Sequence, residues 1–178
     1  MSDGRRQSRE ASSAPGPVVL VVTAEDDRYA AARAEATRLA SEGGGRVILY
    51  DWDAATVLGD PLPSNWSAEG AADDLPGELD EKDLEIAGRA PIAGQIAEAR
   101  DAGVEATAWL PSEPGPEALV EYAREHGVST IVVPQELEAA GELERLATAA
   151  ADPAKGIREQ ADARVVLVPS GGGDARPA

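Results

Sequence analysis

Short apolar runs alternate along this chain with longer amphipathic segments, and this alternation restricts the fold more than any other feature. Most of the runs are rich in valine, as expected for strands buried on both faces of a sheet. They lie at residues 18–22, 47–50, 105–110, 130–133 and 165–168. Five strands separated by helical segments predict an α/β fold with a mostly parallel sheet covered on both faces.

Helices are expected where apolar residues recur at a spacing of three or four. Ile92, Ile96 and Ala99 share one helical face in this way. Gly43 and Gly127 stand where a helix would end, since glycine readily takes the left-handed conformation of a helix C-terminus. The expected helices lie at residues 26–43, 91–102, 116–126 and 137–150.

The charge balance excludes whole classes of partner. The chain has 16 Lys+Arg against 33 Asp+Glu, a formal net charge of −17. Nucleic-acid backbones and anionic membranes both require clustered basic residues, so neither is expected as a partner. Without cysteine there are no disulfides and no thiolate metal ligands. No apolar run approaches a membrane span and no signal-like segment is seen, so we expect a cytoplasmic location.

Composition divides the chain into one domain and two tails. Residues 1–16 and 170–178 lack periodicity and are predicted to be disordered, and 17–169 form the α/β domain. Within it, residues 51–85 form an acidic insert. Its prolines and charges favour disorder, whereas Trp52 and Trp66 favour an ordered lid or an interface arm.

Three stretches resemble the universal stress protein family: AEARDAGVEATAWLP, ALVEYAREHGVSTIVVP and ADARVVLVP. The resemblance covers roughly residues 17–169 and extends to the order of helices and strands. It implies a flavodoxin-like (Rossmann-like) open sheet of strand order 3-2-1-4-5. It also implies a homodimer formed through the last strand, whose residues are Val165, Val166, Leu167 and Val168. That strand is apolar on both faces, and such an edge aggregates unless another chain covers it.

The phosphate-binding motif of the family is missing. Nucleotide-binding members carry Gly-x-x-Gly, nine residues and then Gly-Ser or Gly-Thr after the fourth strand, where backbone N–H groups approach phosphates. Here Pro134 and Leu137 occupy the first two glycine positions. The Gly-Ser pair falls on Ala147-Thr148 or, counted back from the last strand, near Ala151-Asp152. We therefore expect no ATP binding of the usual kind and no bound cofactor.

The end of the first strand also departs from the family, which usually has an aspartate there to hold the ribose. This chain has Thr23, followed by Glu25, Asp26 and Asp27, whose charges would repel a triphosphate. In open parallel sheets, ligands bind beyond the strand ends where the strand order reverses. The candidate pocket, with no metal and no catalytic residue assigned, is therefore lined by Thr23, Ala24, Tyr50, Asp51, Val133 and Pro134.

The expected function is that of a non-enzymatic stress-response or regulatory protein, dimeric and acting with an unknown protein partner. The alternative is a nucleotide (ATP or AMP) binder with an altered phosphate loop, extending to a slow ATPase, or a binder of another small molecule at the same pocket. His126, the single histidine, has two interpretations of its own. The favoured one is that it complements a helix C-terminus, and the alternative is that it acts as a general base.

Further polar and aromatic residues have a structural and a functional interpretation. The favoured structural interpretation makes the acidic residues after 77 a solvated segment, although Ca²⁺ or Mg²⁺ ligation is the alternative. Trp52 is predicted to cover the core rather than stack on a ligand. The acidic residues concerned are Glu78, Asp80, Glu81, Asp83 and Glu85.

Overall fold

The structure is a computed structural model, and it describes most of the predicted α/β domain. The described residues are 16–53, 78–111, 115–135, 137, 157–158 and 160–169. The predicted tails (apart from Gly16), the middle of the acidic insert and nearly all of the helix predicted at 137–150 lie outside these residues. The motif positions 147–148 and 151–152 lie outside them as well.

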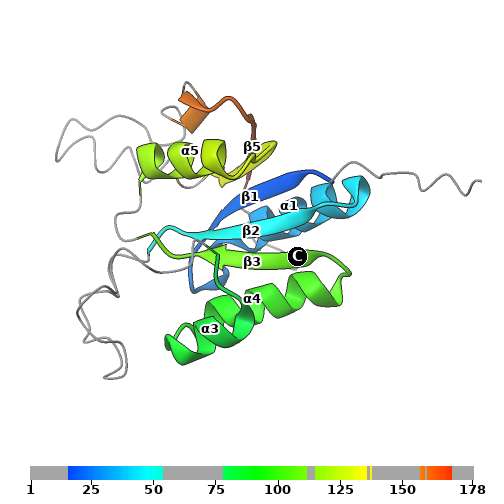
Figure 1. The fold of residues 1–178 in the computed structure, drawn as a ribbon, viewed down its shortest axis with the longest axis vertical. Helices are drawn as coiled ribbons and strands as arrows, with labels where there is room; N and C mark the ends of the chain where they lie inside the picture. Colours follow the sequence, from blue (N-terminus) through cyan, green and yellow to red (C-terminus); the bar gives the residue numbers. More distant parts are fainter. Residues whose placement is uncertain are drawn as a thin grey trace, which may run out of the picture.

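The strands form a single open sheet, which confirms the predicted fold class (Figure 1). All its pairings are parallel, and the strand order is β3-β2-β1-β4-β5. β3 is an edge strand with alternating exposure, as its sequence predicts. The strands are β1 (Val18–Thr23), β2 (Arg46–Asp51), β3 (Glu105–Trp109), β4 (Thr130–Pro134) and β5 (Arg164–Val168).

The described helices agree with the predicted ones, with two differences. The first helix includes Gly43, and the residue that ends it is Gly44, whose φ of 62° is left-handed. The second difference is the helix α3, which begins inside the segment predicted as an insert and ends one residue after it. The helices are η1 (Asp27–Tyr29), a 3₁₀ turn, α1 (Ala30–Gly43), α3 (Glu81–Ile86), α4 (Ala90–Asp101) and α5 (Pro116–Glu125).

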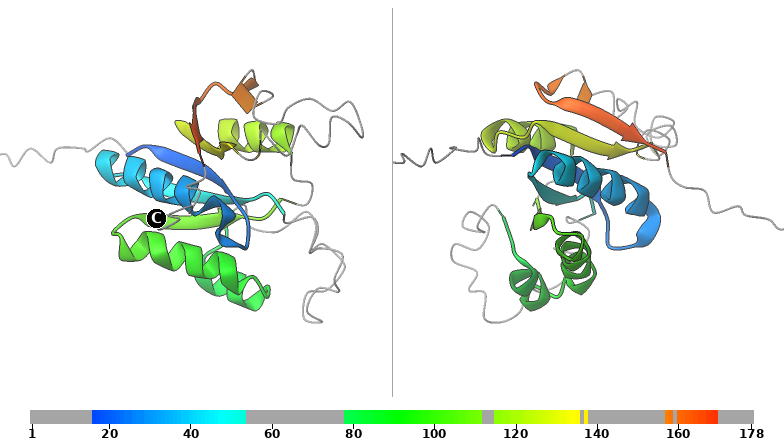
Figure 2. Two further views of the ribbon diagram at one scale, coloured as in Figure 1. Left: turned by 180° about the vertical axis from the view of Figure 1, so that it is seen from behind. Right: turned by 90° about the vertical axis from the view of Figure 1, so that its right-hand side faces the viewer.

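Two apolar cores lie on opposite faces of the sheet. On one face α1 packs through Ala36 and α4 through Ile92 and Ile96 against alternate strand residues. On the other face α5 packs through Leu119 and Tyr122. Figure 2 shows these helices from two further sides. Right-handed crossovers place the helices in this way, because the chain moves from β1 out to β3 and then back across to β4.

The register of the strands fixes the edge of the sheet where a ligand would bind. Thr23, the last residue of β1, pairs with Asp51, the last residue of β2. Since parallel strands end at the same edge, Pro134 at the end of β4 lies there too. The strand order reverses between β1 and β4, so this is the switch point of the sheet. Among the described residues, no helix is long and apolar enough to cross a membrane.

Candidate functional site

A buried ion pair lies at the switch point. The Asp51 side chain is completely buried at the end of β2 and accepts a hydrogen bond from Arg89 Nη2. Arg89 precedes α4 directly, and its side chain is 4% exposed. Arg89 Nη1 also lies 2.9 Å from Glu25 Oε1, as an ion pair without hydrogen-bond geometry. Asp51 is therefore neutralised by the protein itself.

A second buried chain of hydrogen bonds runs beside that pair. The Thr23 hydroxyl donates to Gln95 Oε1 at 2.7 Å, and Gln95 Nε2 donates to the Ala24 carbonyl at 2.7 Å. Arg33 Nη1 on α1 donates to the Thr23 oxygen at 3.3 Å. The Thr23 hydroxyl, the Gln95 amide and the Ala24 carbonyl therefore all have hydrogen-bond partners within the chain, whereas the Arg33 guanidinium is only partly satisfied. The helices α1 and α4 thus close this side of the strand ends.

The two guanidinium groups are incompletely satisfied. Within the described residues, the Nε atoms of Arg33 and Arg89 are buried without a hydrogen-bond partner. Burial lowers the pKa of Arg89, and the nearby Glu25 carboxylate opposes that shift. An arginine stays protonated in proteins even so, because its pKa begins far above neutrality. The site therefore keeps two fixed positive charges facing carboxylates of the turn after β1.

The structure divides the predicted pocket residues between two environments. Thr23, Ala24 and Asp51 take part in the polar network, whereas Tyr50 and Val133 belong to the apolar core under α5. The Tyr50 hydroxyl accepts from the Gly115 amide at 3.1 Å. Burial raises the pKa of Tyr50 to about 12. Pro134 is buried at the end of β4.

Sequence reasoning did not find Arg33, Arg89, Gln95 or the contact of Glu25. Gln95 stands on the buried face of α4 between Ile92 and Ile96, so a polar residue at an apolar position was the available signal. Arg89 gives no such signal, because its neighbours follow no helical period. Trp52 is half-buried and packs against the core under α5, as the favoured interpretation predicts.

A second polar cluster surrounds Glu78, at the end of the predicted insert. Glu78 accepts two hydrogen bonds from the Arg46 guanidinium and one, at 3.0 Å, from the Thr107 hydroxyl. The Arg46 contact holds the Glu78 pKa below its usual value. His126 Nδ1 lies 3.5 Å from Glu78 Oε1. The expectation of a solvated acidic segment is therefore wrong for Glu78, because Arg46 and Thr107 draw it against the sheet.

Two further acidic residues of that segment, Asp80 and Asp83, have a structural role. Asp80 caps α3 by accepting from the Asp83 amide at 2.9 Å, and Asp83 accepts in turn from the Asp80 amide. This reciprocal capping satisfies amides that a helix start leaves without partners. Leu84 on α3 is completely buried. The described residues contain no group of three or more potential ligands that could hold a metal ion.

His126 ends a stack of aromatic rings on α5 and β3. Trp109 stacks on Tyr122 with ring centroids 3.9 Å apart, and Tyr122 stacks on His126 at 4.0 Å. Burial raises the pKa of the Tyr122 hydroxyl. His126 follows α5 directly, at the helix C-terminus where a positive charge is favourable. The stack and this position support the structural interpretation of His126.

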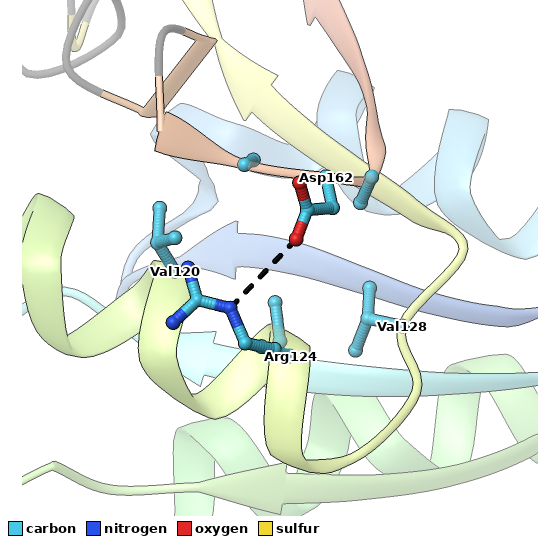
Figure 3. A pocket seen from close by; sticks show the side chains of 7 residues that line it. Val120, Arg124, Val128 and Asp162 are labelled. Atoms are coloured by element: carbon cyan, nitrogen blue, oxygen red, sulfur yellow. Dashed lines mark ion pairs between the residues drawn. The ribbon is translucent and has the colours of Figure 1, made fainter.

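A small pocket between α5 and the start of β5 is unsuited to an organic ligand (Figure 3). Its volume is about 30 Å³, room for a water molecule, whereas ligand pockets measure several hundred Å³. Asp162 and Arg124 form an ion pair of 3.8 Å across it, and Val120 and Val128 line it. We assign this pocket no ligand.

The fold is that of the universal stress proteins. A universal stress protein solved in complex with cAMP superposes with a TM-score of 0.54 at 18% identity, over 87% of this chain and 98% of that one. UspA from Lactobacillus plantarum gives 0.54 at 14% identity, over 87% and 99%. A universal stress protein from Archaeoglobus fulgidus in complex with dAMP gives 0.50 at 14%, over 85% and 96%. No family model matches the sequence, and no curated protein matches it.

Proposed function

We propose that this chain is a non-enzymatic regulatory protein of the stress-response type that does not bind ATP. One observation carries the proposal: the polar groups of the strand ends, Thr23, Ala24 and Asp51, are occupied by the chain's own side chains. Arg89 neutralises Asp51, and Gln95 bonds both Thr23 and the Ala24 carbonyl. A nucleotide would have to replace these contacts in a buried site, where a polar group left without a partner costs about 1–3 kcal/mol.

The charge of the turn after β1 supports the same proposal. Glu25, Asp26 and Asp27 are all exposed beside the switch point. Arg28 pairs with Asp26 at 2.9 Å and with Asp53, so it is not available to a phosphate without breaking those contacts. Repulsion from exposed carboxylates adds to the missing backbone donors of the phosphate motif.

The test combines two measurements on the full chain. Mass spectrometry of small molecules released from the purified protein should detect no ATP, ADP or AMP. Titration calorimetry with Mg-ATP and with AMP should show no binding in the low micromolar range. A one-site isotherm in that range, abolished by Thr23→Val at the end of β1, would contradict the proposal.

The alternative is a nucleotide-binding protein with an altered phosphate loop, or a binder of another small molecule. Two neighbours in the same fold were solved with cAMP and with dAMP. The incompletely satisfied nitrogens of Arg33 and Arg89 also favour a small anion. Nucleotide recovered from the purified protein would favour this candidate, and release of phosphate from ATP would extend it to a slow ATPase.

A homodimer through β5 is the second part of the proposal. Val166 and Val168 point to the face of α1, while Val165 and Leu167 point to the opposite face, and all are half-buried. A groove of about 510 Å³ runs between β5 and α1. The charged residues that line the groove are Glu35, which is negative, and Arg38, which is positive. A second copy related by a two-fold axis would therefore bring opposite charges as well as like charges close together. The occupant that fits is the β5 strand of a second copy. It would form hydrogen bonds with the backbone at the outer edge of β5 and cover the half-buried valines of that strand.

A further inference from the structure

The opposite edge of the sheet, at β3, is closed by residues from outside the sheet. Leu79 forms an antiparallel bridge with Ala108: the Leu79 amide donates to the Ala108 carbonyl at 2.7 Å, and the Ala108 amide donates back at 2.9 Å. Leu79 is 4% exposed and belongs to the core under α4. One buried residue thus occupies the hydrogen-bonding positions that an added strand would use.

A second group on the same edge is also occupied. In a strand, the backbone groups of alternate residues face the same neighbour, so those of Ala106 point the same way as those of Ala108. The Ala106 carbonyl accepts from Arg100 Nη2 at 3.1 Å. Arg100 is held by Glu81 on α3 at 3.4 Å. The Arg100 side chain therefore occupies the next outward-facing carbonyl of β3, two residues before the Leu79 bridge.

The residue before Leu79 holds the bridge in place. Glu78 is bonded by Arg46 of β2 and by Thr107 of β3, one residue before Ala108. The Asp80 cap begins α3 immediately after Leu79, and Leu84 then buries that helix on the sheet. The bridge is thus fixed on both sides in the sequence, although it involves a single residue.

We propose that Leu79, Glu78 and Arg100 form an edge cap that prevents strand addition at β3 and confines strand-to-strand association to β5. Open strand edges pair with other chains, and an open edge at each side of a sheet would allow unlimited head-to-tail growth. With β3 capped, the partner that fits is an extended strand at β5, and association stops at two chains. The limit of two chains per assembly rests on the β5 dimer proposed above, whereas the closure of the β3 edge does not.

The experiment separates the two edges by blocking β5 first. Val166→Lys places a charge in the middle of β5, and this variant should sediment at the 18.4 kDa mass of one chain. Adding Leu79→Pro removes the amide that donates to the Ala108 carbonyl and keeps most of the apolar side chain. The double variant should sediment at twice that mass at micromolar concentration, through the exposed β3 edge. On the wild-type background, Leu79→Pro should give species larger than a dimer.

Leu79→Ala is the matched control. It removes more of the buried side chain than proline does, but it keeps the amide, so it should lower stability without changing the mass. A folded Val166→Lys, Leu79→Pro variant that stays at one chain mass would overturn the cap. If that variant does not fold by circular dichroism, Glu78→Ala with Arg100→Ala on the Val166→Lys background replaces it. These changes remove the side-chain contacts that hold the Leu79 bridge on β3 and free the Ala106 carbonyl, so twice the chain mass is again expected. A folded protein at one chain mass would overturn the cap.

The dimer and the cap fail in different ways. A wild-type protein at one chain mass would contradict the β5 dimer and leave the comparison of Val166→Lys with and without Leu79→Pro as the test of the cap. A wild-type dimer together with an unchanged mass in the capless variants would contradict the cap alone.

Discussion

The two edges of this sheet carry strands of equal length and are completed differently. β3 is covered by a buried leucine, an arginine and a glutamate that lie between 78 and 100 in the chain. Within the described residues, β4 is the only strand that pairs with β5, and no β5 apolar residue is fully buried. The difference shows that, among the described residues, one edge strand is covered by other parts of its own chain and the other is not, and that the sequence of the strand itself does not reveal which.

The largest expected effect is a difference in stability between truncations of one leucine at each edge, Leu79 near β3 and Leu167 in β5. Leu79→Ala should lower the free energy of unfolding by about 2–5 kcal/mol, because it leaves a cavity in a packed core. Leu167→Ala should cost on the order of 1 kcal/mol in the isolated chain, because Leu167 is only half-buried. Urea unfolding at low protein concentration measures both. Equal costs would show that β5 is as well covered as β3.

The next effect concerns assembly. Wild-type protein at micromolar concentration should sediment as a dimer. The Arg164 amide donates to the Ser129 carbonyl, so alternation along β5 turns the Val165 amide away from β4, and Val165→Pro should shift the protein toward one chain by deleting that outer donor. Screening over about 8 Å at physiological salt keeps the long-range repulsion between acidic chains weak. Glu105→Lys, an exposed change in β3, should leave the mass unchanged. A loss of mass with that control as well would attribute association to charge rather than to β5.

A smaller effect depends on pH and belongs to the β3 edge. The Arg46 contact lowers the Glu78 pKa in the folded protein below the unfolded value of about 4.3. The contact therefore stabilises fully above that value, and its contribution disappears as the pH falls through the folded pKa. The difference in urea midpoint between wild type and Glu78→Gln should shrink between about pH 6 and about pH 3. The exposed Glu117→Gln should show no such trend.

The smallest effect is expected beside β5. Arg38 on α1 bonds Glu35 at 2.7 Å and Glu42, and these carboxylates raise its pKa. Its side chain is half exposed, and exposed ion pairs add little to stability. Arg38→Gln should leave the urea midpoint of the monomer unchanged. A change in dimer mass with an unchanged midpoint would place Arg38 in the interface.

The sequence predicts the sheet well because strands and helices are local patterns. The apolar runs and the faces of α4 and α5 follow from the spacing of residues. The strand order is the one that the resemblance to the universal stress proteins implies. The bridge of Leu79 is not predicted, because a single leucine among acidic residues has no period. The helix α3 is not predicted either, because its six residues are too few to show a helical period.

The polar network at the switch point escapes prediction for another reason. Thr23 and Gln95 are 72 residues apart, and Asp51 and Arg89 are 38 apart. In the sequence, a buried arginine gives the same signal as an exposed one, so only the packing of α4 on the strand ends identifies it. The predicted pocket residues therefore lie at the carboxyl edge of the sheet, but the side chains that fill that edge come from helices.

The ring stack on α5 gives the β3 edge a spectroscopic signature. His126 is the only histidine and lies face-on to Tyr122, with 19° between the ring planes. Ring currents should therefore shift its carbon-bound imidazole protons to high field, as one resolved pair of nuclear magnetic resonance lines. Because the same imidazole lies beside Glu78, those lines should move when the edge contact opens. The His126 resonances of the unmodified protein would thus report whether the contact at the β3 edge is open or closed.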